Sequence, residues 1–141
     1  NQPLTARGDR NDQDNLSMQF DPDVLKAEAF KVVGKFQCSK DCFAGGVAAA
    51  LLAASGEIFT GICIDSACSL GFCAEHAAIA EMLKHRQTRI VAVIAVNYKG
   101  AVIPPCGRCR EMLHQVDSEN WDTAIILDNA VVTLRDLLPM R

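Results

Sequence analysis

The feature that most constrains the fold is a pair of cysteine motifs on either side of a long apolar run. Gly71–His76 and Pro104–Arg110 each open an amphipathic pattern with helical spacing, and Arg89–Val96 between them is almost wholly apolar. Such a run is typical of a strand buried on both faces of a sheet. The chain therefore predicts a helix, a buried strand and a second helix. If both helices pack on one face of the sheet, their N-termini meet and the cysteines of the two motifs converge.

Those cysteines, Cys73, Cys106 and Cys109, form the ligand set of a predicted zinc site. A structural zinc site has four protein ligands, whereas a catalytic site has three and leaves one position for water. The N-terminus of a helix also favours thiolate over thiol, because its backbone N–H groups are free and its end of the dipole is positive. We therefore expect one catalytic Zn²⁺ per chain.

Glu75 is the predicted catalytic residue. It lies two residues after Cys73 on the first turn of the same helix, so its carboxylate can reach a water on the metal without displacing it. A carboxylate in that place can take a proton from the water and pass it to a substrate, which is general acid–base catalysis. The alternative is an ordinary acidic residue in a first helical turn, which the helix dipole favours in any protein.

The two motifs together resemble the paired signature of the zinc-dependent cytidine deaminase superfamily. Cys73-Ala74-Glu75 is followed by Pro105-Cys106-Gly107-Arg108-Cys109-Arg110, and the first cysteines of the two motifs are 33 positions apart. The all-cysteine ligand set is similar to the branch that acts on free nucleosides, which includes cytidine deaminases and blasticidin S deaminases. The resemblance implies an α/β fold with three α-β-α layers and a mixed five-stranded sheet. It also implies hydrolytic deamination of the cytosine-like base of cytidine or deoxycytidine.

The resemblance also implies which residues contact the substrate. Gly61–Asp65 takes the place of a G-x-N-x-E segment, whose Asn and Glu hold the ribose hydroxyl in the family. Cys63 and Asp65 are therefore the implied substrate-binding residues, together with Ala74. Here a thiol replaces the amide, Asp replaces the longer Glu, and the pocket Phe of the family falls at Gly45. Blasticidin S or another modified aminopyrimidine is therefore an alternative substrate.

Positive side chains are expected beside the thiolates, because three thiolates carry more negative charge than Zn²⁺ neutralises. In the family, an Arg directly after the catalytic Glu hydrogen-bonds the thiolates. His76 holds that position here, and Arg108 and Arg110 are further candidates for the same task. The alternative for His76 is a packed or solvated side chain without a part in the site.

Composition limits which partners and which cellular compartment are expected for this chain. The 141 residues are 50% hydrophobic, which suffices for one domain with its own core. Net charge is −3 with no cluster of Lys and Arg, so we expect a small-molecule substrate and no nucleic acid. No apolar stretch approaches the roughly 20 residues of a membrane span. The odd number of cysteines and the aliphatic content favour a soluble protein of the reducing cytoplasm over a disulfide scaffold. The resemblance implies a homotetramer.

Patterns along the rest of the chain predict the remaining elements. Residues 1–20 are almost without apolar side chains and predict a flexible N-terminal extension, followed by a deaminase-like domain over residues 21–141. Asp21-Pro22-Asp23 predicts a helix start. The five expected strands are Val47–Ala53 and Glu57–Cys63, joined as a hairpin, then Arg89–Val96, Thr123–Leu127 and Val131–Thr133. Loops are expected at Phe36–Gly46, Asn97–Gly100 and Ser118–Asp122, and a short last helix at Leu134–Leu138.

Two other classes of function stay open. Cys106 and Cys109 form a Cys-x-x-Cys pair at a helix start, which is the arrangement of a thiol–disulfide oxidoreductase. In that case Cys73 and Glu75 would be accidental. The altered ribose segment would also suit a protein that binds pyrimidines in a deaminase-like pocket but has lost turnover.

Overall fold

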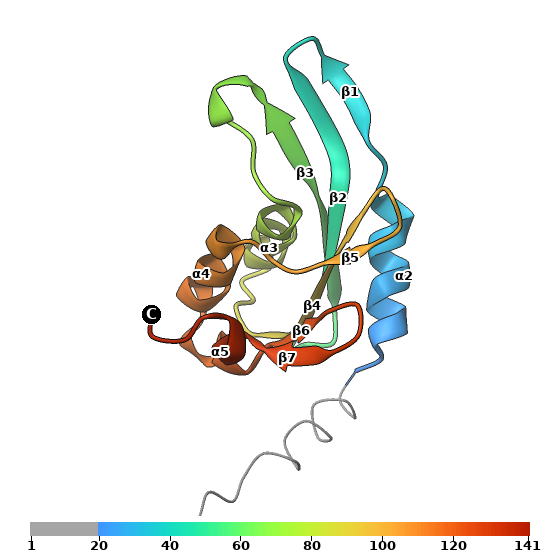
Figure 1. Cartoon of the computed structure of the whole chain (residues 1–141). Helices are drawn as coiled ribbons and strands as arrows, with labels where there is room; N and C mark the ends of the chain where they lie inside the picture. Colours follow the sequence, from blue (N-terminus) through green and yellow to red (C-terminus); the bar gives the residue numbers. More distant parts are fainter. Residues whose placement is uncertain (1–19) are drawn as a thin grey trace, which may run out of the picture.

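A mixed β-sheet forms the middle of the molecule, and helices cover both of its faces (Figure 1). The computed structural model describes residues 20–141, so the predicted N-terminal extension lies, except for Phe20, outside the described residues. The helices are α2 (Pro22–Val32), α3 (Ala74–Lys84), α4 (Gly107–Val116), α5 (Leu134–Leu137) and two 3₁₀ helices, η1 (Ala67–Ser69) and η2 (Ser118–Asp122). The strands are β1 (Phe36–Ser39), β2 (Cys42–Ala53), β3 (Ile58–Ser66), β4 (Ile90–Asn97), β5 (Val102–Ile103), β6 (Ala124–Ile126) and β7 (Val131–Thr133).

The sheet has seven strands, against five predicted, but they fill five positions across its width. β3 pairs along one side of β2, whereas β1 and β4 pair with successive parts of its other side. β5 and β6 likewise pair with successive parts of β4, and β7 pairs with β6. The β4–β6 pair is parallel and the others are antiparallel, so the predicted α/β class with a mixed sheet is confirmed.

The prediction of a loop at Phe36–Gly46 is wrong, because this segment forms β1 and the start of β2. The four residues of β1, Phe-Gln-Cys-Ser, alternate between apolar and polar side chains, but the stretch is at the lower limit of length for that pattern and all four residues are exposed. Pairing of β1 depends on backbone hydrogen bonds to β2. The other missed strand, β5, has only two residues. The predicted loop at Ser118–Asp122 is a 3₁₀ helix.

Alternate residues of the central strands face two separate hydrophobic clusters. Ala48 and Ala50 of β2 belong to the cluster that packs under α2. Ala49 and Leu51 belong to the cluster on the opposite face, which contains residues of both α3 and α4. The two helices that carry the cysteine motifs therefore lie on one face, as predicted, and they contact each other. None of the helices between residues 20 and 141 is long and apolar enough to cross a bilayer.

Helix α3 lies directly on the backbone of β3 at Gly61. A Cβ atom placed on Gly61 would be 2.4 Å from the backbone nitrogen of Ala78 and 2.7 Å from the carbonyl oxygen of Ala74. Only a glycine permits this approach. The height of α3 above the sheet is therefore set at this contact.

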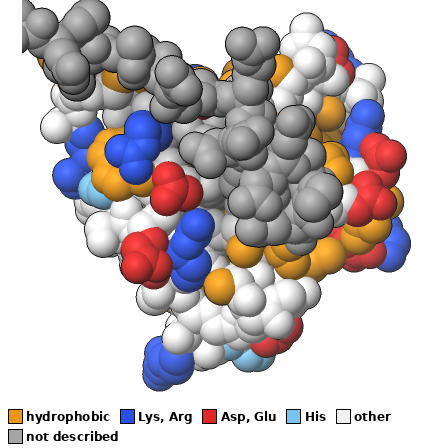
Figure 2. All heavy atoms as spheres, turned by 90° about the horizontal axis from the view of Figure 1, so that it is seen from below, with side chains coloured by type: hydrophobic (Ala, Val, Ile, Leu, Met, Phe, Trp, Pro, Cys, Tyr) orange, Lys and Arg blue, Asp and Glu red, His pale blue; other side chains and the backbone are white. Residues whose placement is uncertain are grey.

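The face seen from below carries basic and acidic side chains next to one another, with hydrophobic side chains among them (Figure 2). On this face the coloured side chains form no patch of one sign. Interspersed charges of this kind produce only a weak long-range field.

A buried asparagine joins β4, α4 and η2. Asn120 is fully buried, and its Oδ1 accepts hydrogen bonds from the backbone N–H of Ile90 at 2.8 Å and from Arg89 at 3.1 Å. Its Nδ2 donates to the carbonyl oxygens of Leu113 at 2.9 Å and Thr88 at 3.1 Å. The side chain is thus fully satisfied, and it holds the end of α4 beside the start of β4.

Asn120→Ala is expected to lower the free energy of unfolding by about 3 kcal/mol, because it leaves several buried backbone groups without partners. Urea denaturation followed by circular dichroism measures the change. The matched control is Asn129→Ala, which removes an exposed Asn from a turn and should change stability by less than about 0.5 kcal/mol. Equal effects of the two substitutions would contradict a structural role for Asn120.

Candidate metal centre and active site

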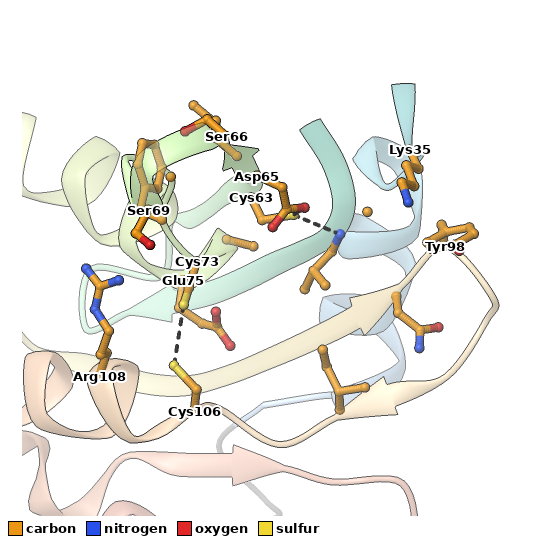
Figure 3. A pocket seen from close by; sticks show the side chains of 18 of the residues that line it. Lys35, Cys63, Asp65, Ser66, Ser69, Cys73, Glu75, Tyr98, Cys106 and Arg108 are labelled. Atoms are coloured by element: carbon orange, nitrogen blue, oxygen red, sulfur yellow. Dashed lines mark hydrogen bonds between the residues drawn. The ribbon is translucent and has the colours of Figure 1, made fainter. Parts of the chain in front are cut away.

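The three predicted ligands meet at the starts of α3 and α4, and Figure 3 shows two of them, Cys73 and Cys106. Cys73 is the N-cap residue of α3, Cys106 is the N-cap residue of α4, and Cys109 lies in the first turn of α4. The Sγ atoms of Cys73 and Cys106 are 3.4 Å apart, and those of Cys106 and Cys109 are 3.6 Å apart. Residues from two distant motifs are therefore brought to one point.

These spacings between sulfurs fit a zinc ion. Zn–S bonds of about 2.3 Å at tetrahedral angles place neighbouring sulfurs about 3.8 Å apart. All seven cysteines are free thiols, so a disulfide engages none of the three. The oxidoreductase hypothesis gives no reason for Cys73 to lie beside the Cys-x-x-Cys pair, whereas a metal site requires it.

Local sequence fixes the start of α4. Pro104 and Pro105 keep the chain extended up to the N-cap, because proline disfavours helix in the residue before it. Arg110 then donates from Nε to the carbonyl oxygen of Pro105 at 2.9 Å and from Nη1 to that of Leu137 at 3.1 Å. Arg110 thus braces α4 against α5, and backbone carbonyls engage its guanidinium.

Glu75 lies beside the thiols and is 4% exposed. Its Oε2 accepts a hydrogen bond from the thiol of Cys109 at 3.4 Å. Among the residues from 20 to 141, no Lys, Arg or His nitrogen lies within 4.0 Å of its carboxylate. A buried carboxyl group without a cationic partner is costly, and such groups are concentrated at functional sites.

The thiols differ in how readily they ionise. Burial raises the pKa of Cys73, and the neighbouring Cys106 adds to the effect. Burial also raises the pKa of Cys109, where the Glu75 carboxylate is the next cause. For Cys106, burial again acts upward, but a hydrogen bond from the backbone N–H of Cys109 and the adjacent thiols outweigh it, so its pKa lies below the ordinary value. A dication at the centre would reverse the balance by favouring all three thiolates.

His76 lies against the thiols. A ring nitrogen of His76 and the sulfurs of Cys73 and Cys109 all lie within 4.8 Å of one another. Its Nε2 is buried and has no hydrogen-bond partner among the described residues. Burial lowers the pKa of His76, and the positive charge of Arg108 lowers it further. Of the predicted positive neighbours, His76 lies beside the thiols, and Arg108 lies beside His76.

The metal centre opens into a cavity of about 610 Å³ (Figure 3). All residues that the sequence predicts as substrate-binding, Cys63, Asp65 and Ala74, line this cavity, as do Glu75 and Arg108. The volume is within the range of sites for small molecules.

Cys63 is buried in the cavity wall and engaged by its neighbours. Its Sγ accepts a hydrogen bond from the backbone N–H of Val47 at 3.2 Å, and its thiol lies 3.8 Å from Oδ2 of Asp65. The carboxylate of Asp65 is exposed, and it faces the cavity next to the Cys63 thiol (Figure 3). A thiol that is held in this way cannot offer the two strong hydrogen bonds of the amide that it replaces.

Three polar residues of the cavity, Lys35, Asn97 and Tyr98, are absent from the sequence-based site. Lys35 precedes a strand that the sequence does not reveal, and Asn97 and Tyr98 belong to what the sequence presents as an ordinary turn. No local pattern marks any of them. The register of β2 against β4, which pairs Val47 with Asn97, brings Asn97 and Tyr98 to the cavity.

Comparison with known proteins defines the class. The family model of the cytidine and deoxycytidylate deaminase zinc-binding region matches residues 24–124. A cytidine deaminase of Mycobacterium tuberculosis is 33% identical over 96 residues, which cover 66% of this chain and 69% of the relative. One of Halalkalibacterium halodurans is 31% identical over 99 residues, which cover 66% and 74%. The chain belongs to the cytidine and deoxycytidylate deaminase family.

Solved structures of the same class share the fold. A crystal structure of cytidine deaminase from Mycobacterium tuberculosis superposes with a TM-score of 0.74 at 28% identity, covering 86% of this chain and 97% of that one. Cytidine deaminase from Mycobacterium leprae gives a TM-score of 0.74 at 27% identity, with 86% and 100% covered. The three-layer arrangement expected from the sequence is thus the arrangement of cytidine deaminases.

Proposed function

We propose that this chain catalyses the hydrolytic deamination of a cytosine-like base in a free nucleoside, such as cytidine or deoxycytidine, to the uracil form and ammonia. One observation carries the proposal: three thiols from two helix starts approach one point, and the buried carboxylate of Glu75 lies 3.4 Å from one of them. Membership of the deaminase family supports the same reaction.

We assign Cys73, Cys106 and Cys109 as the ligands of one Zn²⁺. When bound, zinc supplies a Lewis acid that lowers the pKa of water to near neutrality. Three protein ligands leave a coordination position for that water. The free N–H groups at the starts of α3 and α4 stabilise the thiolates.

Glu75 moves the protons in the proposed reaction. Its carboxylate accepts a proton from the attacking water and passes it to the ring nitrogen beside the amino-bearing carbon, which makes that carbon electrophilic. The water oxygen then bonds to this carbon. Glu75 takes up the second proton of the water and delivers it to the amino group, the C–N bond breaks, and ammonia leaves. Water and aminopyrimidine are thereby converted to the uracil form and ammonia without another reactant.

The remaining cavity residues are proposed to position the substrate. Ala74 is the first residue of α3, so its backbone N–H has no partner within the helix and can contact the base. Asp65 can accept a hydrogen bond from a sugar hydroxyl, and the thiol of Cys63 contacts the Asp65 carboxylate. Because this sugar side differs from the G-x-N-x-E pattern, blasticidin S or another modified aminopyrimidine is the second candidate substrate.

Release of ammonia from a panel of substrates tests the proposal. Zinc-loaded protein is expected to release ammonia from at least one of cytidine, deoxycytidine and blasticidin S. The ranking of their kcat/KM values identifies which sugar the protein prefers on the cytosine base. Tight binding of these compounds without ammonia release would instead support a pyrimidine-binding protein. Neither binding nor turnover of any aminopyrimidine would overturn the proposal.

We propose that His76 donates a hydrogen bond to a thiolate and is not itself a ligand, because a fourth protein ligand would close the site to water. His76→Ala should therefore keep about one zinc per chain and lower kcat by roughly 10–100-fold, the usual cost of losing an outer partner of a metal site. Elemental analysis and steady-state kinetics measure the two effects. His85→Ala, an exposed position on the same helix, is the control. Loss of zinc from His76→Ala would identify His76 as a ligand.

A homotetramer is proposed from the family resemblance. Exposed hydrophobic side chains support association, because Phe36, Phe43, Leu70 and Phe72 lie on or next to β1, β2 and β3 and are at least 37% exposed. Sedimentation velocity at micromolar concentration should show a species of four chains. A monomer under all conditions would contradict the proposal.

We also propose that the protein works in a reducing compartment such as the cytoplasm. The seven free cysteines support this, because oxidation of the ligand thiols would prevent metal binding. Cell fractionation checks the location, and recovery from an oxidising compartment with paired cysteines would contradict it.

A further inference from the structure

A lysine without an acidic partner lines one end of the cavity. In Figure 3, Lys35 and Tyr98 lie at one end and Arg108 at the other, with the metal centre nearer to Arg108. The Nζ atom of Lys35 is 5.6 Å from the centre of the Tyr98 ring and 5.3 Å from that of Phe43, which is a cation–π arrangement. No carboxylate oxygen between residues 20 and 141 lies within 4.0 Å of this ammonium group. The protein therefore holds a positive charge at the cavity without neutralising it.

A glycine allows the segment that carries Lys35 to reach the cavity. Gly45 has a φ of +76°, and its carbonyl oxygen accepts a hydrogen bond from the backbone N–H of Gly34 at 2.8 Å. A Cβ on Gly45 would be 2.2 Å from the carbonyl oxygen of Gly34, so no other residue permits this approach. The backbone contact between Gly34 and Gly45 therefore places Lys35 beside the cavity.

The side chain of Lys35 is exposed, and its stem lies beside Gly46 at the cavity. Its Cγ and Cδ atoms and the ring of Tyr98 lie within 4.0 Å of the position that a Cβ on Gly46 would take. The backbone N–H of Tyr98 donates to the carbonyl oxygen of Gly46 at 2.9 Å, which fixes the ring next to the stem. The ends of β2 and β4 therefore place the Tyr98 ring next to the stem of Lys35.

Asn97 adds donors to the same end of the cavity. Its Oδ1 accepts hydrogen bonds from the backbone N–H groups of Lys99 at 3.1 Å and Ala101 at 2.9 Å. The two N–H bonds of its Nδ2 have no partner among residues 20–141, and Asn97 lines the cavity. Lys35, Asn97 and the hydroxyl of Tyr98 together supply one cation and several hydrogen-bond donors.

We propose that Lys35, assisted by Asn97 and Tyr98, binds an anionic group on the sugar side of the substrate. This inference rests on the proposed deaminase function, which places the base at the metal centre. A cation with surrounding donors matches a carboxylate or a phosphate, because hydrogen bonds between charged partners are the strong ones. Asp65 suits a hydroxyl of the same sugar. The substrate class is therefore an aminopyrimidine nucleoside that carries a carboxylate or phosphate on its sugar.

Two compounds of nearly the same shape, one negatively charged and one neutral, test the proposal. One is a cytosine nucleoside whose sugar ends in a carboxylate, and the other is the matching carboxamide. The zinc-loaded protein should turn over the carboxylate with a kcat/KM about tenfold above that of the carboxamide at low salt, through KM and not kcat. The ratio should fall as sodium chloride is added, because salt screens an exposed charge. The kcat/KM for cytidine monophosphate is measured in parallel, and its comparison with that for the carboxylate shows which of the two anionic groups the protein prefers.

Lys35→Gln is expected to bring the carboxylate-to-carboxamide ratio of kcat/KM close to one, because it removes the charge that favours the carboxylate. Lys99→Gln is the matched control, because Lys99 lies 5.8 Å from the same Tyr98 ring but does not line the cavity. It should keep the tenfold ratio. A ratio near one in the unmodified protein, or an equal ratio in Lys35→Gln, would overturn the proposal.

Binding of the corresponding uracil compounds separates this proposal from the proposed reaction. These compounds cannot be deaminated, so calorimetry reports the Lys35 contact even in a protein that turns nothing over. A preference for the uracil carboxylate that Lys35→Gln abolishes would support the anion site whether or not ammonia is released. Equal affinity for carboxylate and carboxamide would reject the anion site, although ammonia release from cytidine would still support the deaminase function.

Discussion

Glu75→Gln is expected to lower kcat for ammonia release by about a thousandfold, within the range that general acid–base catalysis contributes. Gln has nearly the shape of Glu, but it cannot take a proton from water and return it to the ring. Because the proposed mechanism gives Glu75 a hydrogen bond to the Cys109 thiol and no bond to the metal, the protein should keep about one zinc per chain. Steady-state kinetics and elemental analysis measure the two quantities on the same preparation.

Glu81→Gln is the control for this experiment. Glu81 lies on the same helix, but it is exposed and forms an ion pair with Lys84 at 2.9 Å, so its loss should leave kcat within twofold. A kcat for Glu75→Gln within tenfold of that of the unmodified protein would remove Glu75 from the proton transfers. Loss of zinc from the same variant would show instead that the carboxylate helps to hold the metal.

Cys106→Ala is expected to remove most of the bound zinc and with it the activity. Loss of an outer partner of a metal site costs roughly 10–100-fold in affinity, and loss of one of three ligands should cost more than that. Cys106 is exposed, and its side chain makes no capping hydrogen bond, so the substitution opens no hole in the core. A competition titration with a zinc chelator measures the affinity, and thermal unfolding confirms that the fold is kept.

Cys38→Ser is the matched control, because Cys38 is an equally exposed thiol that lies on β1 and does not line the cavity. It should retain both zinc and activity. If Cys106→Ala binds zinc as tightly as Cys38→Ser does, the three-thiol site is incorrect. Cys73, His76 and Cys109 would then be the remaining group close enough to hold the ion.

Much of the site could be predicted from the sequence, because its chemistry is concentrated in two short motifs that each start a helix. The apolar run before the second motif predicts the buried strand that became β4. A parallel β4–β6 pair needs a crossover, and α4 supplies it on the face that α3 also covers. Once both helices share a face, convergence of Cys73 with Cys106 follows from the position of the cysteines at the helix starts.

The cavity rim could not be predicted in the same way, because contacts between distant backbone segments create it. Lys35 precedes a short, exposed strand, and its place depends on the contact between Gly34 and Gly45. Asn97 reaches the cavity through the register of β4 against β2. Neither residue stands in a recognisable motif, and both line the cavity.

The contact between α3 and β3 at Gly61 has a consequence for how this enzyme can change. Gly61 does not line the cavity, yet any side chain there would meet the backbone of α3. The helix would have to rise, and Cys73 and Glu75, which α3 carries, would rise with it. Mutagenesis aimed at new substrates therefore has freedom around Lys35 and Tyr98, and very little under the helix that holds the catalytic carboxylate.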